Sequence, residues 1–275
     1  MEASDQKVED LRLSDDEKKT LDKLDEKFDH IVLLVNATNV MELGFVDDYK
    51  NIDSVLWIGA PGQVGSHSIA KMLKGEVNPS GRLTDTYAYD LESNPAVLNT
   101  GDFQYKEDGE GVRRYFQNNE ESIYVGYRYY ETFTSEADYD LAVQYPFGYG
   151  LSYTDFTWQT ESTEVKDGKI TAKVKVTNTG KVAGKDVVQL YYEPPYTAGG
   201  IEKSAIVLGG YAKTKTIQPE ESETVTVSFN VDDMASYDDE TAKTWVLEAG
   251  DYGIKIAKNV HEFVDEFSYS QAETL

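Results

Sequence analysis

Two short, uninterrupted apolar runs constrain the fold more than any other feature of the sequence. Ile31–Val35 (IVLLV) and Ser54–Ile58 (SVLWI) do not alternate with polar residues. Each run therefore predicts a strand that is covered on both faces, as strands of parallel sheets are. The roughly twenty residues between them are enough for the crossover that joins parallel strands. We therefore predict an α/β layer.

A helix is predicted just before the first run. Ser14 and Glu17 form the Ser-x-x-Glu capping box, and two aspartates between them place negative charge at the positive end of the helix dipole. Apolar residues then recur at helical spacing, at Leu21, Leu24 and Phe28.

A second helix is predicted after the second run. The glycine-rich stretch 59–65 leads into residues 66–73, and Gly75 is a typical helix end. The stretch lacks the P-loop lysine and the full Gly-x-Gly-x-x-Gly spacing, so phosphate binding is not favoured.

Two βα units are too few to cover their own sheet. The strands that complete the sheet are expected to lie outside this chain. Without them, the sheet is expected to have an exposed apolar edge. Such edges promote self-association, so a homo-oligomer is a possible state.

The stretch from 78 to 153 is irregular and rich in tyrosine. Tyrosine covers apolar surface and offers a hydroxyl, which suits a domain interface or contact with sugar. We favour interface packing. The glycines interleaved there, Gly126, Gly148 and Gly150, predict places where backbone approaches backbone.

From about residue 156 the pattern becomes all-β. Ile170, Ala172, Val174 and Val176 alternate with polar residues, which predicts a half-buried strand. Further short strands are predicted at 186–193, 205–211, 225–229, 245–247 and 252–256. Such spacing indicates an immunoglobulin-like sandwich. The predicted domains are thus 1–155, a partial α/β sandwich with parallel strands, and 156–275, an all-β sandwich of the immunoglobulin or fibronectin III type.

Composition excludes several classes of partner. The formal net charge of −24 repels phosphate backbones and anionic headgroups, so neither nucleic acid nor a membrane is expected as partner. No apolar run is long enough to span a bilayer. The chain has no cysteine, and Met1–Asp10 has no apolar signal segment, so a cytoplasmic location is expected. A signal could have been lost with a missing N-terminal part.

Several segments, taken in order, resemble glycoside hydrolase family 3. They are 56–63 (LWIGAPGQ), 70–83 (AKMLKGEVNPSGRL), 123–130 (IYVGYRYY) and 146–153 (PFGYGLSY). Residues 176–184 (VTNTGKVAG) and 186–191 (DVVQLY) resemble the fibronectin type III-like domain of that family.

The resemblance implies part of a β-glucosidase-like enzyme. Such enzymes retain anomeric configuration and combine a (β/α)8 barrel, an α/β sandwich and often the fibronectin-like domain. This chain resembles only the second half of the α/β sandwich plus the last domain. It would be the C-terminal portion of an exo-acting β-glycosidase for β-linked glucosides or related oligosaccharides. It would be incomplete without a barrel supplied in cis or in trans. The alternative is a non-catalytic module that binds carbohydrate or stabilises another domain.

The resemblance also implies one catalytic residue. In many family members the general acid/base is a glutamate in a Gly-Glu-Gly-aromatic-Asp-Arg motif. Met1–Gln6 (MEASDQ) lies in that place, with Glu2 and Asp5 at the acids. Both glycines, the aromatic residue and the arginine are replaced. Glu2 is the candidate general acid/base, against the alternative of an ordinary charged residue at a frayed terminus. The nucleophilic aspartate of the barrel, in a Ser-Asp-Trp or similar setting, is absent from this sequence.

Other polar groupings are weaker candidates. His30, His67 and His261 are isolated in sequence, so neither a metal site nor a cofactor is predicted. Residues 66–68 (SHS) lack the Gly-x-Ser-x-Gly elbow of a hydrolase triad. The acidic stretches 232–233 and 238–240 could attract calcium but lack EF-hand spacing, so solvated loops are the favoured interpretation.

Overall fold

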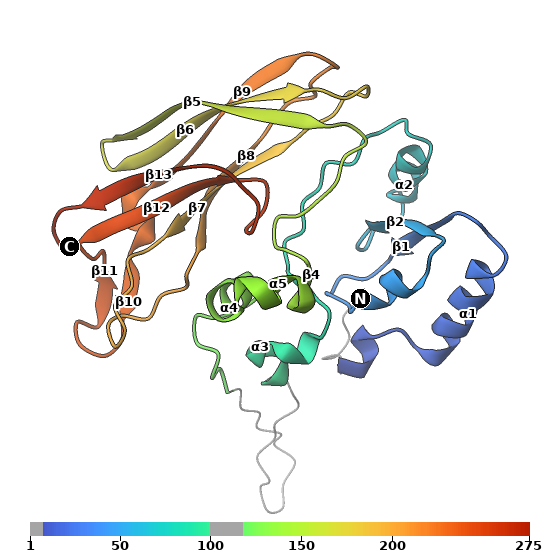
Figure 1. Ribbon diagram of the computed structural model, residues 1–275, viewed down its shortest axis with the longest axis horizontal. Coiled ribbons are helices and arrows are strands. Elements are labelled where there is room, and N and C mark those ends of the chain that lie inside the picture. The colour runs from blue at the N-terminus through green and yellow to red at the C-terminus, as the bar shows by residue number, and fades with distance from the viewer. Residues whose placement is uncertain (1–7, 100–117) are drawn as a thin grey trace, which may run out of the picture. The chain divides into compact units, whose positions relative to one another are not determined.

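A computed structural model describes residues 8–99 and 118–275 (Figure 1). The described residues form two compact units. The first comprises 8–66, 86–99, 118–130 and 134–145, and the second comprises 67–85, 131–133 and 146–275. The chain therefore passes from one unit to the other several times before it enters the long C-terminal part of the second.

The first unit is an α/β layer of short elements. In chain order they are η1 (Val8–Leu11), α1 (Asp15–Asp25), β1 (Ile31–Val35), η2 (Gly44–Asp48), β2 (Ile52–Trp57), β3 (Tyr87–Ala88), η3 (Leu91–Ser93), α3 (Pro95–Leu98), α5 (Glu136–Ala142) and β4 (Val143–Tyr145). Two helices, α2 (Ser66–Leu73) and α4 (Tyr127–Phe133), each begin in the first unit and continue into the second.

Helix α1 begins at the predicted capping box. The Glu17 N–H donates to the Ser14 hydroxyl (3.4 Å), and the Ser14 N–H donates to the Glu17 carboxylate (2.9 Å). The Ser14 hydroxyl also donates to Glu17, and these bonds lower the pKa of that carboxyl. The helix ends at Asp25, so the expected helical face stops short of Phe28, which is 54% exposed.

Strands β1 and β2 pair in parallel, as predicted, with Val32 opposite Ser54 and Val35 opposite Trp57. The expected burial on both faces is wrong for the described chain. Val32 and Leu34 are 49% and 37% exposed, because no further layer of described residues covers that face. The two strands have no other partner among the described residues, so the predicted exposed apolar edge is present.

Helix α2 forms where the glycine-rich stretch predicted it. Gly59 and Gly62 have positive φ angles of 56° and 63°, which turn the chain from β2 toward the helix. Gly75 closes the helix with φ 73° and donates its N–H to the carbonyl oxygen of Met72 (2.9 Å).

Tyrosines build a small core in the first unit. Tyr130 and Tyr139 pack with Ala88 and Val143, and all four are at most 5% exposed. Part of the tyrosine-rich stretch, residues 100–117, lies outside the described residues. The role of these tyrosines at a domain interface stays a prediction.

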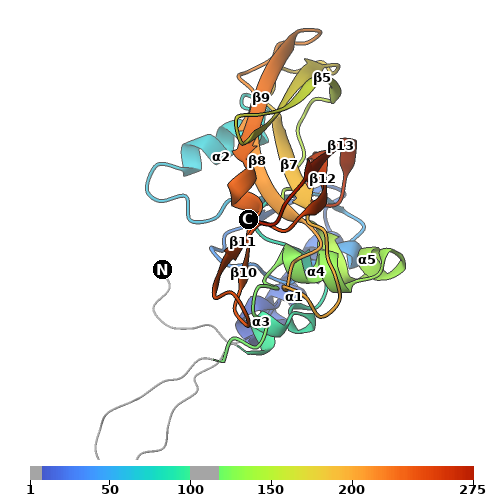
Figure 2. The same ribbon diagram turned by 90° about the vertical axis from the view of Figure 1, so that its left-hand side faces the viewer.

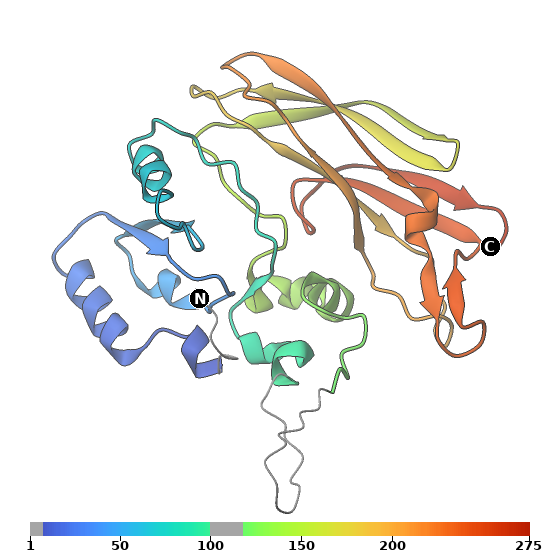
Figure 3. The same ribbon diagram turned by 180° about the vertical axis from the view of Figure 1, so that it is seen from behind.

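The second unit is dominated by a β-sandwich (Figures 2 and 3). One sheet has the order β13-β12-β7-β8 and the other β5-β6-β9. The strands are β5 (Phe156–Lys166), β6 (Lys169–Asn178), β7 (Val187–Glu193), β8 (Val207–Lys213), β9 (Ser222–Asn230), β12 (Gly250–Ala257) and β13 (Phe263–Gln271). After β9 come η4 (Val231–Met234) and a hairpin of β10 (Ser236–Asp238) and β11 (Thr244–Val246).

The sandwich core follows the predicted alternation. Ile170, Ala172, Val174 and Val176 of β6 are fully buried, while the residues between them face outward or are half-buried. Burial of each larger aliphatic side chain contributes about 1.5–3 kcal/mol. The central strand β7 is buried on both faces from Val187 to Tyr192. Among the described helices, none is long and apolar enough to cross a membrane.

Candidate functional site

The carboxyl ends of β1 and β2 open onto a hollow in the first unit. Residues that follow the two strands, together with the end of η1, enclose a volume of about 320 Å³. The lining residues are Asp10, Leu11, Asn36, Ala37, Thr38, Asn39, Met41 and Ala60. Open α/β sheets bind ligands in the crevice outside the carboxyl ends of their strands. This hollow is therefore the candidate site in the described residues.

Hydrogen bonds fix the loop that follows β1. The indole N–H of Trp57 donates to the carbonyl oxygen of Ala37 (2.8 Å). Farther along, the N–H of Glu42 donates to the carbonyl oxygen of Leu11 (3.0 Å). The loop is thus held on one side by β2 and on the other by the end of η1. Because of these bonds, η1 lies next to the hollow.

Arg12 anchors the same segment electrostatically. Its guanidinium donates two hydrogen bonds to Glu42 (2.9 and 3.0 Å) and one to Glu92 (2.8 Å). The bond to Glu42 is the largest cause of a raised Arg12 pKa. Glu42 also accepts the N–H of Leu91 (3.0 Å). Arg12 therefore joins the start of the described chain to the loop after β1 and to η3.

The lining of the hollow includes neutral polar side chains, of which the Thr38 hydroxyl donates to the Asn39 amide oxygen (3.5 Å). The amides of Asn36 and Asn39 and the hydroxyl of Thr38 can exchange hydrogen bonds with sugar hydroxyls. Among the lining residues, Asp10 alone carries a carboxylate. Retaining glycoside hydrolysis needs two carboxyl groups about 5–5.5 Å apart. The lining of the hollow does not supply this catalytic pair.

Sequence reasoning did not single out Asp10 or the polar run 36–39. Their position in the sequence was a signal that could have found them. The run 36–39 comes directly after the predicted strand Ile31–Val35, and polar residues at that point lie at the carboxyl edge of a parallel sheet. The proposed acid/base, Glu2, and the rest of its MEASDQ motif lie outside the described residues.

The histidines do not gather into a site. His30 contacts Asp53 (2.8 Å) at the surface, and His261 contacts Glu131 (3.2 Å) in the second unit. His67 is exposed in the first turn of α2. Within 8–99 and 118–275, no three His, Cys, Asp or Glu side chains are arranged to hold a metal ion.

The acidic loops serve local structure. Asp238 accepts the N–H groups of Glu240 (3.0 Å), Thr241 (2.8 Å) and Ala242 (3.0 Å). Asp233 accepts the N–H of Asn230 (3.0 Å) at the start of η4. These carboxylates stabilise the turns that contain them.

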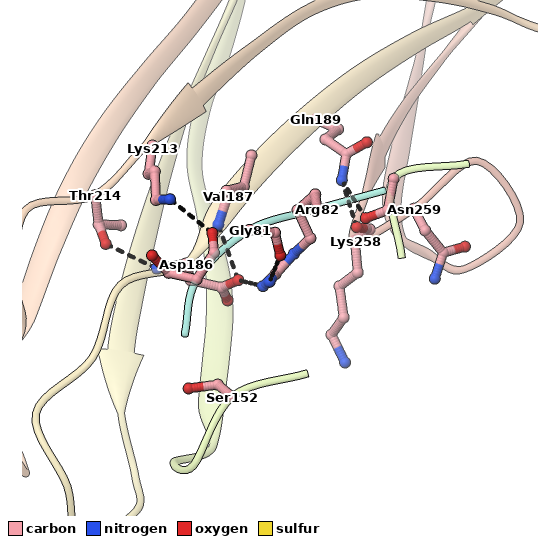
Figure 4. Close-up of polar contacts among 12 residues, drawn as sticks. Gly81, Arg82, Ser152, Asp186, Val187, Gln189, Lys213, Thr214, Lys258 and Asn259 are labelled. Atoms are coloured by element: carbon pink, nitrogen blue, oxygen red, sulfur yellow. Dashed lines mark hydrogen bonds and ion pairs between the residues drawn. The ribbon is translucent and has the colours of Figure 1, made fainter. Parts of the chain in front are cut away.

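Residues 78–83, the last part of the segment 70–83 that resembles family 3, are attached to the sandwich through a buried ion pair. Arg82 and Asp186 point toward each other in Figure 4, with Nη2 and Oδ1 2.6 Å apart. Their side chains are only 14% and 8% exposed. The Asp186 carboxylate also accepts the N–H of Val187 (2.8 Å) and the indole N–H of Trp158 (2.8 Å). We call these four residues the Arg82–Asp186 cluster.

A second bond attaches the same segment to β8. The Lys213 ammonium donates to the carbonyl oxygen of Ser80 (2.6 Å), and burial followed by repulsion from Lys185 and Arg82 lowers its pKa. Asn78 donates to the carbonyl oxygen of Ala183 (3.2 Å). The motif residues of 78–83 thus hold this segment on the sandwich.

Of the three glycines singled out from sequence, Gly150 marks an approach of backbone to backbone, whereas Gly148 is approached by a side chain and not by backbone. A Cβ on Gly148 would lie 2.3 Å from the side chain of Gln189, and one on Gly150 would lie 2.5 Å from the carbonyl oxygen of Gly81. The expectation for Gly126 is wrong, because no described atom lies within 4 Å of its Cβ position. Its positive φ of 58° is what requires glycine there.

Comparison with known proteins decides the family. The glycosyl hydrolase family 3 C-terminal domain matches residues 1–153, more than half of the chain. The chain belongs to glycosyl hydrolase family 3. A fibronectin type III-like domain also matches, over residues 186–260. The predicted family and the predicted order, an α/β part followed by a fibronectin III-like sandwich, are confirmed. The boundary between 155 and 156 stays a prediction.

The β-glucosidase relatives align with most of this chain but are much longer. The chain is 38% identical to a β-glucosidase of Ruminococcus albus over 95% of its own length and 26% of the relative. It is 39% identical to β-glucosidase A of Butyrivibrio fibrisolvens, over 92% and 31%. The chain therefore spans about a quarter to a third of these relatives.

Solved β-glucosidase structures have the same fold. A β-glucosidase from Paenibacillus barengoltzii aligns with a TM-score of 0.85 at 36% identity, covering 96% of this chain and 28% of that one. β-Glucosidase 3B from Thermotoga neapolitana, solved with α-D-glucose, aligns with a TM-score of 0.80 at 31% identity, covering 96% and 35%.

Proposed function

We propose that this chain is the C-terminal portion of a retaining, exo-acting β-glycosidase that hydrolyses β-linked glucosides or related oligosaccharides. The observation that carries the proposal is the match over nearly the whole chain to proteins named β-glucosidase. The remaining length of those relatives leaves room for the (β/α)8 barrel, which would act here in cis or in trans.

The proposed reaction divides the two carboxyl groups between the two parts. A barrel aspartate attacks the anomeric carbon while Glu2 gives its proton to the glycosidic oxygen, and the alcohol leaves. Glu2 then takes a proton from water, which attacks the glycosyl ester and restores the aspartate. The acid form of Glu2 must persist near neutral pH, so its pKa must be raised by burial or by a neighbouring charge. Docking of the barrel would provide both.

The anchoring of the segment next to the hollow supports this assignment. Five residues lie between Glu2 and Val8, so covalent geometry limits the distance between the two to roughly 21 Å. Leu11 and Arg12 are fixed to the loop after β1 by the bonds described above. Asp10 and the polar run 36–39 line the adjoining hollow, where they would contact a hydroxyl-bearing ligand.

A chimera tests the proposal. In it, this chain replaces the matching 28% of the Paenibacillus barengoltzii enzyme. We expect the chimera to hydrolyse 4-nitrophenyl β-D-glucoside and the isolated chain to show no turnover. Glu2→Gln in the chimera should lower kcat by about 10²–10⁴, the usual contribution of general acid catalysis. The loss should be smaller for a 2,4-dinitrophenyl leaving group, which needs little protonation.

Glu9→Gln is the matched control, because Glu9 is an exposed carboxylate on the same segment. Its kcat should stay within twofold of the parent. Efficient hydrolysis by the isolated chain would refute the division of the site. An active chimera that is indifferent to Glu2→Gln would refute the assignment of Glu2.

The alternative function is a non-catalytic module that binds carbohydrate or stabilises another domain. It is favoured by the single carboxylate in the lining of the hollow and by the use of the 78–83 motif for attachment to the sandwich. A chimera that folds but stays inactive with every aryl glycoside would support this alternative. For location, the absence of cysteine supports a reducing compartment such as the cytoplasm, which cell fractionation would test.

A further inference from the structure

The hairpin of β10 and β11 carries a pair of exposed aromatic residues. Tyr237 and Trp245 lie directly opposite each other in the antiparallel register. Their ring centroids are 5.6 Å apart and the ring planes meet at 74°. Trp245 is 66% exposed and Tyr237 48% exposed. Figure 3 shows the hairpin extending from one end of the sandwich.

Hydrogen bonds fix the Tyr237 ring and the loop of the hairpin. The Tyr237 hydroxyl donates to the carbonyl oxygen of Lys243 (3.2 Å), across the hairpin loop. The Asp238 carboxylate holds three N–H groups of the same loop. Lys243 is a non-glycine residue with a positive φ of 54°, a conformation that the loop bonds maintain. The backbone of the hairpin and the Tyr237 ring are therefore held in place, and the Trp245 ring lies edge-on against Tyr237.

The indole of Trp245 differs from the other two in the chain. The N–H of Trp57 donates to a carbonyl oxygen and that of Trp158 donates to Asp186. The N–H of Trp245 has no hydrogen-bond partner in the described part of the chain. Cross-strand aromatic pairs stabilise hairpins by about 0.2–1 kcal/mol, and this pair leaves the Trp245 side chain 66% exposed to a ligand.

We propose that Tyr237 and Trp245 form a binding platform for a neutral, β-linked saccharide chain. The axial C–H groups of a pyranose ring would lie against the indole, and the indole N–H would donate to a sugar hydroxyl. The neighbouring carboxylates of Asp239 and Glu240 accept hydrogen bonds from hydroxyls. These acids and the net charge of −24 repel an anionic polysaccharide.

This platform belongs to the second unit, whereas the hollow belongs to the first. The saccharide class follows from the proposed function, but the site itself does not depend on Glu2 or on catalysis. It would keep the enzyme on a polymer surface or on a long oligosaccharide.

Calorimetric titration of the full 275-residue chain with cellohexaose tests the platform. We expect measurable binding, and Trp245→Ala should weaken it about tenfold or more, the effect of losing one buried aromatic face. Trp245→Phe keeps a ring and should retain part of the affinity, which separates stacking from collapse of the hairpin. Polygalacturonate should not bind.

Tyr211→Ala is the matched control, since Tyr211 is 68% exposed on β8 of the same unit. Its affinity should stay within twofold of the parent. Absence of cellohexaose binding by the parent chain, or equal affinity of Trp245→Ala and the parent, would overturn the platform. Trp245→Ala in the chimera should leave hydrolysis of the aryl glucoside unchanged, so failure of the platform and failure of the proposed catalytic role give different results.

Discussion

Replacing Asp186 with alanine should strongly destabilise the second unit, because its buried carboxylate accepts three hydrogen bonds. The carboxylate of Asp186 accepts from the Arg82 guanidinium, the Trp158 indole and the Val187 backbone. All three donors lose their acceptor at once. The Arg82 side chain is 14% exposed, so water replaces the lost acceptor only in part.

The expected magnitude follows from this burial. Removing one partner of a buried ion pair costs about 3–5 kcal/mol, because the remaining charge is left without compensation. The residual exposure of Arg82 favours the lower part of that range, about 3–4 kcal/mol. For a unit of roughly 150 residues, where each kcal/mol shifts Tm by about 2–4 °C, we expect Tm to fall by about 6–16 °C.

Arg82→Met should cost less, about 1–2 kcal/mol, because Asp186 keeps the N–H groups of Trp158 and Val187. Urea unfolding followed by tryptophan fluorescence measures both variants and the double variant. The double variant should be more stable than the sum of the single losses predicts, since the two residues are in direct contact.

The exposed pair Lys258–Glu262 provides the control. Its side chains are 45% and 56% exposed, so Glu262→Gln should change the free energy of unfolding by less than about 1 kcal/mol. A loss below 1 kcal/mol for Asp186→Ala, or strict additivity with Arg82→Met, would contradict the reasoning.

Three further outcomes are expected. Gly150→Ala should lower Tm by several degrees, because the new Cβ would lie 2.5 Å from a backbone oxygen; Gly81→Ala, which meets open space, should not, and equal Tm values would argue against the close approach. Burial raises the pKa of Tyr252 to about 12, so the folded state retains that proton above pH 10 while the unfolded state loses it. The free energy of unfolding should therefore fall between about pH 10 and 12. Circular dichroism should show a smaller fall for Tyr252→Phe. The exposed face of β1 should drive concentration-dependent self-association, which Val32→Lys should reduce in light scattering; a strictly monomeric parent chain would rule this out.

The sandwich was the most predictable part of the fold. Its strands carry a two-residue period that burial enforces, so Ile170 to Val176 could be assigned from sequence alone. The capping box of α1 and the glycine end of α2 were equally visible, because both are local hydrogen-bonding requirements. β5 and β13 were not individually recognised, since most of their residues are exposed or half-buried and lack a clear apolar alternation.

The candidate site was less predictable because it depends on groups distant in sequence. The hollow combines Asp10 with residues 36–41 and Ala60, and nothing local to any of them indicates that they meet. The partners of Arg82 were hidden for the same reason, since Asp186 lies 104 residues away. Burial of Ile31–Val35 was overestimated. An apolar run indicates that a strand is suited to burial on both faces, but it does not indicate whether the covering layer is on the same chain.

The assignment of residues 67–85 to the second unit bears on how family 3 domains can be exchanged. A swap at residue 156 would move the strands of the sandwich but leave behind Arg82 and Ser80, the partners of Asp186 and Lys213. A recipient enzyme would then have to provide equivalent side chains from its own α/β part. Grafting is expected to succeed only when the sandwich travels together with this earlier, non-contiguous piece of sequence.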